Sequence, residues 1–146
     1  MKTNKQINIL SVDVGQKGGL AIKTKKGLET RPWKFTGLEE LLNMVEPILT
    51  EQEIEFVIVG RPTRFPTVIA RHSKMLAIIE LLCQEYDIPY YETIDSEAKK
   101  EVLGKGNAKK PEIAEWGEKI LPGKSEDEYD ALMFLFFAQE RCIIEV

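Results

Sequence analysis

The feature that most constrains the fold is a near-continuous apolar run at residues 55–60, with the sequence EFVIVG. A strand with one face in water alternates apolar and polar residues, whereas a strand covered on both faces is apolar almost throughout. The run therefore predicts a central strand in a sheet that carries helices on both faces. That arrangement is typical of α/β proteins.

The segments before this run have the pattern of an antiparallel meander followed by a helix. The expected strands are residues 7–15, 20–24 and 29–35, the last of them weakened by Pro32. Glycines and a Lys-Lys-Gly tip separate them, as in hairpins. A capping box of Thr36 and Glu39 predicts the start of a helix, and Pro47 is expected to kink that helix or end it early.

The segments after the run alternate helix and strand and then become helical. We expect a helix at 67–86, a strand at 89–94, and helices at 96–103, 109–121 and 125–141. Gly104 ends the second of these helices, and a capping box of Ser125 and Glu128 opens the last. The order predicts a mixed five-stranded sheet with helices on both faces. A length of 146 residues fits one domain over residues 1–146.

Composition excludes several classes of protein. The longest apolar run, residues 131–138, is far short of the roughly 20 residues that a membrane span needs. No secretion signal opens the chain, and two cysteines are too few for a disulfide framework, so we expect a cytoplasmic protein. A net charge of −4 and a pI of about 5.2 argue at first against a nucleic-acid partner.

Three aspartates are candidates for a metal site. Asp13 ends the first expected strand, where ligands gather in α/β sheets, although an aspartate before a glycine turn can also cap that turn. Asp127 and Asp130 are three apart and share a helix face, although acidic residues in a first turn also oppose the helix dipole. Apolar residues follow Asp130, so its carboxylate borders the core and needs a partner such as Mg²⁺. The single histidine, His72, has no partner at zinc-ligand spacing.

Basic residues gather in three groups. Residues 99–110 hold five lysines against one glutamate, a local charge of +4. A second group lies at 61–74 and includes His72, and a third at 17–26. Any single group can be a solvated face, but three groups beside one acidic site favour a nucleic-acid partner. Metal bound by the acids at 126–130 would offset much of the negative charge, so the low pI does not exclude this partner.

Several segments resemble the RuvC-type Holliday junction resolvases, which have the RNase H-like fold. The resemblance rests on residues 9–15, 19–22, 88–92, 99–104, 106–110 and 127–132. It covers nearly the whole chain in the right order. It implies an endonuclease that uses Mg²⁺, with Mn²⁺ as a substitute, and that cleaves branched DNA as a homodimer in recombination and repair.

The resemblance also assigns roles to residues. Asp13, Asp127 and Asp130 match three of the four metal-binding carboxylates of the family. Lys99 and Lys110 match its two lysines near the scissile phosphate and DNA backbone. Phe65 lies near the aromatic that stacks at the junction, although core packing of a loop explains it as well. The expected DNA-contacting residues are Arg61, Arg64, Phe65, Lys100, Lys105 and Lys109.

The chain departs from the family at Gly60, where the fourth carboxylate is a glutamate. The segment 57–62 instead resembles the YqgF branch of the superfamily, in which an acidic residue on the next strand completes the site. Asp95 is the first candidate for that ligand and Glu92 the second, or no residue replaces the glutamate. Two other functions therefore stay open: a YqgF-like nuclease acting on structured RNA, and a catalytically degenerate protein that binds nucleic acid.

Overall fold

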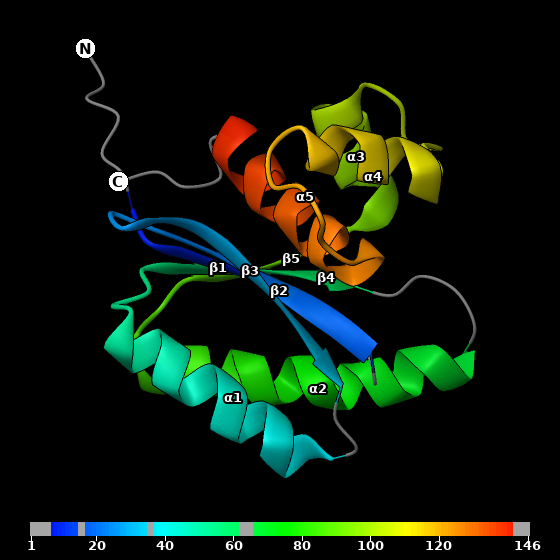
Figure 1. The fold of residues 1–146 in the computed structure, drawn as a ribbon. Coiled ribbons are helices and arrows are strands. Elements are labelled where there is room, and N and C mark those ends of the chain that lie inside the picture. The colour runs from blue at the N-terminus through cyan, green and yellow to red at the C-terminus, as the bar shows by residue number, and fades with distance from the viewer. Residues whose placement is uncertain (1–6, 15–16, 35–36, 62–65, 142–146) are drawn as a thin grey trace.

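The computed structural model describes residues 7–14, 17–34, 37–61 and 66–141, apart from the side chains of 66–69 (Figure 1). The strands are β1 (Ile9–Asp13), β2 (Lys17–Thr24), β3 (Gly27–Lys34), β4 (Phe56–Arg61) and β5 (Tyr90–Ile94). The helices are α1 (Leu38–Glu51), α2 (Pro66–Glu85), α3 (Asp95–Leu103), α4 (Lys110–Glu118) and α5 (Glu126–Glu140). The predicted order of strands and helices is confirmed.

The strands form one five-stranded sheet in the order β3-β2-β1-β4-β5. β2 is antiparallel to both β1 and β3, whereas β4 is parallel to both β1 and β5. Helices α1 and α2 cover one face of the sheet, and α3, α4 and α5 lie on the other (Figure 1). The mixed sheet with helices on both faces is thus as predicted.

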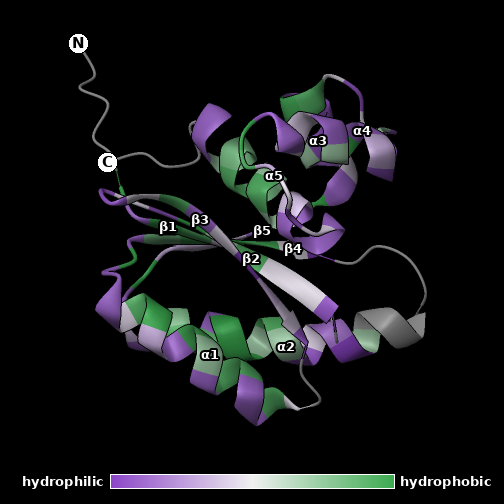
Figure 2. Ribbon diagram, in the orientation of Figure 1, coloured by the Kyte–Doolittle hydropathy of each residue, from purple (hydrophilic) through white to green (hydrophobic). Residues whose placement is uncertain are grey.

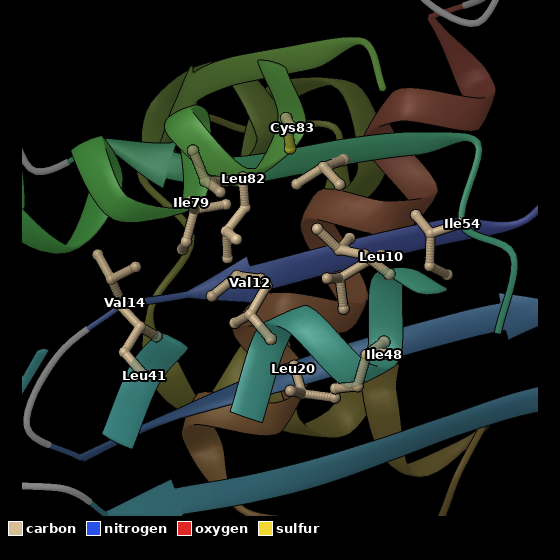
Figure 3. Packing of buried hydrophobic residues seen from close by; sticks show 14 of the residues in the cluster. Leu10, Val12, Val14, Leu20, Leu41, Ile48, Ile54, Ile79, Leu82 and Cys83 are labelled. Carbon is tan, nitrogen blue, oxygen red and sulfur yellow. The ribbon is translucent and has the colours of Figure 1, made fainter. Parts of the chain in front are cut away.

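Two apolar cores lie on opposite faces of the sheet, and alternate residues of each central strand enter different cores. Leu10 and Val12 of β1 pack with residues of α1 and α2 (Figure 3). Ile9 of β1 and Ile58 of β4 pack with the apolar residues of α5. Hydrophobic residues line the sheet and the helix sides that face it (Figure 2). The two-sided burial expected of residues 55–60 is therefore real: Val57, Ile58 and Val59 are fully buried.

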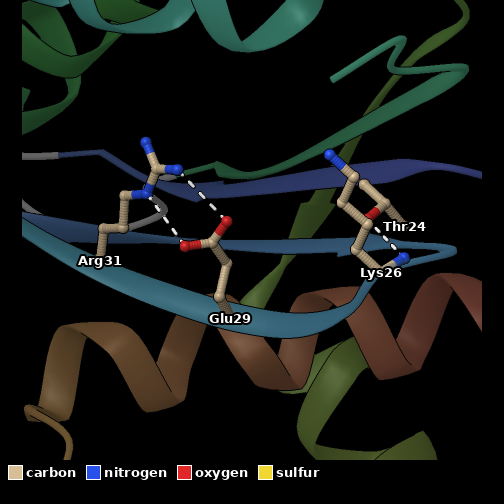
Figure 4. Close-up of polar contacts among 4 residues, drawn as sticks. All are labelled: Thr24, Lys26, Glu29 and Arg31. Carbon is tan, nitrogen blue, oxygen red and sulfur yellow. Dashed lines mark hydrogen bonds and ion pairs between the residues drawn. The ribbon is translucent and has the colours of Figure 1, made fainter. Parts of the chain in front are cut away.

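The hairpin of β2 and β3 ends the sheet on one side. Thr24 pairs with Gly27 across the tip, where the Lys26 amide donates to Thr24 Oγ1 at 3.2 Å (Figure 4). Glu29 and Arg31 form an exposed ion pair on β3 at 3.2 Å (Figure 4). Exposed pairs add little stability, but charges on an edge strand discourage pairing with other chains.

Helix α1 differs from the sequence prediction at two points. Its N-cap is Gly37, which provides no side-chain cap, and the predicted capping residue Thr36 lies outside the described residues. Pro47 lies inside the helix, so the prediction that the helix ends early there is wrong. The reason is packing, because Val45 and Ile48 are buried on either side of the proline and hold the chain helical.

Within the part of the chain that the structure describes, no helix combines the length and the apolar character required to cross a bilayer.

Candidate active site

Asp13 reaches the site because of the alternation along β1. Ile9 and Ser11 face α5, and Asp13 is the next residue on that side of the strand. The Ser11 hydroxyl donates to the backbone oxygen of Ala131 at 2.6 Å and is fully buried. This bond fixes the height of α5 above β1 and brings the first turns of α5 close to Asp13.

The first turn of α5 is held by the predicted capping box. Ser125 Oγ accepts from the Glu128 amide at 3.2 Å, and the Glu128 carboxylate accepts from the Ser125 amide at 3.1 Å. The same carboxylate accepts a buried hydrogen bond of 2.6 Å from the Thr30 hydroxyl of β3. Glu128 therefore ties the start of the helix to the sheet and is not free to act as a ligand.

A glycine of β2 allows α5 to lie directly on the sheet. A Cβ atom on Gly19 would come within 2.8 Å of the backbone carbon of Asp127 and the nitrogen of Glu128. Any larger residue would push the helix start outward. Since Gly19 pairs with Asp13 across β1 and β2, the close approach occurs beside this aspartate.

The three predicted carboxylates come together. Asp13, Asp127 and Asp130 each offer an oxygen, and these oxygens all lie within 4.8 Å of one another. Burial raises the pKa of Asp13 well above its ordinary value, and the negative charges of Asp130, Asp127 and Asp95 raise it further. Three hard oxygen donors at this spacing suit a divalent cation such as Mg²⁺. The donor set thus fits the metal that the resemblance implies.

Lys110 contacts the cluster from the first turn of α4. Its ammonium donates to Asp130 Oδ2 at 2.6 Å, and the Lys110 side chain is 54% exposed while that of Asp130 is 11% exposed. Burial lowers the pKa of Lys110, but the hydrogen bond and the charges of the three aspartates outweigh this and raise it overall. Lys110 therefore stays charged at the edge of the site.

Phe134 fills the space next to Gly60, the position at which the resemblance implies a fourth carboxylate in the resolvases. Val12 pairs with Val59, so the residues that follow, Asp13 and Gly60, are neighbours on the α5 side of the sheet. A Cβ atom at position 60 would lie 2.4 Å from the ring of Phe134. The ring is 1% exposed and packs in the core around α5. A glutamate side chain at position 60 would therefore clash with the Phe134 ring as it is packed in this chain.

The two alternative acidic residues lie in different places. Asp95 is exposed at the start of α3, and its charge contributes to raising the pKa of both Asp13 and Asp130. Glu92 accepts a 2.7 Å hydrogen bond from the Tyr90 hydroxyl, on the face of the sheet that α2 covers. Glu92 is therefore turned away from Asp13, and Asp95 is the one of the two whose charge acts on Asp13 and Asp130.

The remaining predicted residues are spread around the site. Lys99 is half-buried on α3, and among the described residues no hydrogen bond or ion pair joins it to the carboxylates. Lys100 and Lys109 are exposed, and Lys105 pairs with Glu112 at 2.7 Å. Arg61 is exposed and lies on the same side of β4 as Val57 and Val59, which is the α1–α2 face of the sheet. Arg64 and Phe65 lie outside the described residues.

Sequence reasoning missed Thr30 and Phe134, which shape the site without carrying its chemistry. Thr30 lies on an exposed-looking edge strand, and its partner Glu128 is 98 positions away in sequence. Phe134 belongs to an apolar run that indicates only burial. The one available signal was Gly60 itself, since a glycine in a central strand often marks a close approach of another group.

The arrangement of strands and helices is that of the RNase H-like, RuvC-type fold. A structure of RuvC from Thermus thermophilus aligns with a TM-score of 0.77 and 19% identity, covering 94% of this chain and 96% of the other. T. thermophilus RuvC in complex with a Holliday junction substrate aligns with a TM-score of 0.78 and 18% identity, covering 94% and 95%. YeaZ from Pseudomonas aeruginosa aligns with a TM-score of 0.50 and 15% identity over 66% of this chain and 47% of YeaZ. No family model matches the chain, and neither does any curated protein.

Proposed function

We propose that this protein is a metal-dependent endonuclease that cleaves branched DNA in the manner of a Holliday junction resolvase. The observation that carries the proposal is the convergence of Asp13, Asp127 and Asp130 within 4.8 Å at the carboxyl end of β1. A protein with the same fold, T. thermophilus RuvC, has been observed with a Holliday junction substrate. Fold and site chemistry point to the same reaction class.

Asp13, Asp127 and Asp130 would hold the metal, with Mg²⁺ as the physiological ion and Mn²⁺ as its substitute. Asp95 is the candidate for a further ligand, because its charge already acts on Asp13 and Asp130. When bound, the metal supplies activation of water and neutralisation of charge on the phosphodiester. The Ser11 and Glu128 contacts keep the carboxylates in register, so the site is formed before any ion binds.

Lysines would bind the phosphate backbone next to the carboxylates. Lys110 lies within hydrogen-bond distance of the cluster and can neutralise charge that builds on the cleaved phosphate. Lys99 on α3 is assigned the second such role. Lys100, Lys105 and Lys109, with Arg64 and Phe65, are the proposed DNA contacts, whereas Arg61, also expected to contact DNA, lies on the α1–α2 face and not on that of the aspartates. These lysines belong to α3, to the first residue of α4 and to the segment between them, and both helices lie on the same side of the sheet as α5 (Figure 1).

We further propose that the active form is a homodimer. A four-way junction has approximate twofold symmetry, so a twofold dimer presents one site to each of two equivalent strands. The expected product of one binding event is a pair of symmetric cuts. Sedimentation of the protein on junction DNA measures the stoichiometry.

The test of function is cleavage of a synthetic four-way junction in Mg²⁺. Wild-type protein should cut the junction, and Asp13→Asn should not, since it removes a ligand charge without changing size. The matched control is Glu29→Gln, which removes an exposed carboxylate on β3 whose ion pair, within the described ranges, is with Arg31 and not with a residue of the cluster. Cleavage by Asp13→Asn at the wild-type rate would contradict the mechanism.

Gly60 favours a second candidate, a YqgF-like nuclease that acts on structured RNA. The same assay with a structured RNA substrate separates the two, because only one of them should cut RNA faster than the junction. Binding of nucleic acid without metal, together with no cleavage of either substrate, would instead support a catalytically degenerate protein.

A further inference from the structure

We propose that Lys110 is the counter-ion of the carboxylate cluster in the metal-free protein, and that its ammonium and a divalent cation compete for Asp130. This inference rests on the metal binding of the proposed function. It adds that Lys110 opposes metal binding and is released by it.

The first argument is the charge balance of the cluster. Three carboxylates offer oxygens within 4.8 Å of one another, and Asp130 is only 8% exposed. Like charges packed this closely repel strongly unless a cation is present. Among the ion pairs of the described residues, Lys110 with Asp130 is the one that reaches these aspartates. One ammonium therefore serves three carboxylates, which leaves an excess of negative charge to attract a divalent ion.

The second argument is that the lysine occupies one oxygen of a candidate ligand carboxylate. The 2.6 Å contact places the ammonium on Oδ2 of Asp130, one of the carboxylates that form the metal-binding group. An oxygen that accepts so short a charged hydrogen bond is a poorer ligand until the bond breaks. We therefore expect metal binding to Asp130 to weaken or displace this contact.

The third argument is that the two partners differ in freedom to move. Asp130 projects from a helix whose residues 128–135 are all buried, so its carboxylate stays in place. The Lys110 side chain is 54% exposed and sits on the first residue of α4, on a flexible four-carbon stem. The lysine is thus the partner that leaves. Once released, its charge lies beside the site and is available to an anionic ligand such as a phosphate.

The experiment measures Mn²⁺ affinity by titration calorimetry on the full chain without nucleic acid. Lys110→Met should bind Mn²⁺ roughly tenfold more tightly than wild type, because the competing charged hydrogen bond is gone. The matched control is Lys109→Met, which removes the same charge from the adjacent, exposed residue. The control should change the affinity by less than about twofold, the effect of a screened surface charge.

A second measurement needs no variant. In the wild-type chain, the side-chain ammonium signal of Lys110 is followed by ¹⁵N NMR during titration with diamagnetic Mg²⁺. The signal should be protected from water exchange in EDTA and lose that protection as Mg²⁺ binds, whereas the Lys109 signal should not change.

The outcomes separate the inference from the proposed function. Failure of the wild-type protein to bind Mn²⁺ would overturn the metal centre and this inference with it. Binding by wild type, with Lys110→Met equal or weaker in affinity, would overturn the inference and leave the metal centre standing. Persistence of the protected Lys110 signal at saturating Mg²⁺ would also overturn the inference alone.

Discussion

Replacing Gly60 by alanine tests how firmly Phe134 closes the space beside Asp13. The new Cβ would lie 2.4 Å from Cε2 and 2.5 Å from Cζ of the ring, far inside van der Waals contact. The ring cannot swing into solvent, because it is 1% exposed within the core around α5. Either the ring leaves its rotamer or α5 lifts from the sheet. Overpacking of this kind costs about 1–3 kcal/mol.

The assay is thermal and urea unfolding followed by circular dichroism. For a domain of this size, about 1 kcal/mol corresponds to roughly 4 °C in the unfolding temperature. Gly60→Ala should therefore lower that temperature by about 4–12 °C. Removing the ring should relieve the clash. The double variant Gly60→Ala, Phe134→Ala should therefore lose less unfolding free energy than the sum of the losses in the two single variants, by about 1 kcal/mol or more.

Phe137 provides the control for this cycle. It is a fully buried ring on the same helix, packed against Tyr91 of β5. Gly60→Ala and Phe137→Ala should be additive within about 0.5 kcal/mol, the usual error for sites without a shared contact. Wild-type stability of Gly60→Ala, or equal coupling to both rings, would refute the steric reasoning.

Three further predictions concern charge and burial. Burial tends to raise the pKa of Glu128, but hydrogen bonds from Thr30 and Ser125 outweigh it and lower the pKa below the ordinary 4.5, so the ionised form stabilises the fold. Glu128→Gln should therefore lower the free energy of unfolding by about 2 kcal/mol at pH 7, as measured by urea unfolding. The difference from wild type should shrink as the pH falls through the folded-state pKa of Glu128. A difference that stays constant from pH 7 to 3 would contradict this prediction. Burial is the main cause that raises the pKa of the Cys83 thiol to about 12. In a Cys142→Ser background, this thiol should therefore react with an aromatic disulfide only when the chain unfolds. Fast labelling of the native chain would disprove this prediction. Burial and three negatively charged neighbours disfavour the ionised form of the Asp13 carboxylate. In EDTA, Asp13→Asn should therefore raise the unfolding temperature. A decrease would contradict this reasoning and show that other contacts stabilise Asp13.

Periodicity in the sequence was enough to predict the sheet, the place of Asp13 at a strand end and the shared helix face of Asp127 and Asp130, whereas the resemblance to the resolvases implied that the three form one site. Asp13 followed from the end of a strand, and Asp127 and Asp130 from the i, i+3 spacing of a helix. These relations are local, so the chain order and the strand alternation determine them. The confirmed capping box of Ser125 and Glu128 is local as well.

Contacts between distant segments could not be predicted in the same way. The ring of Phe134 opposite Gly60 depends on the height and rotation of α5, which no single segment encodes. The bond from Thr30 to Glu128 joins an edge strand to a helix across 98 positions. The helix continued past Pro47 because buried neighbours outweighed the local propensity, as packing commonly does.

Helix α5 carries two of the three aspartates and also the largest share of the core around it, since residues 128–135 are all buried. The site therefore cannot open or melt on its own, because loosening the first turns of α5 exposes the core beneath them. The binding free energy of a ligand at the carboxylates therefore stabilises the whole folded chain against unfolding. A thermal shift of the whole chain is for this reason a direct measure of ligand binding at the cluster, and a screen of ions needs no catalytic turnover.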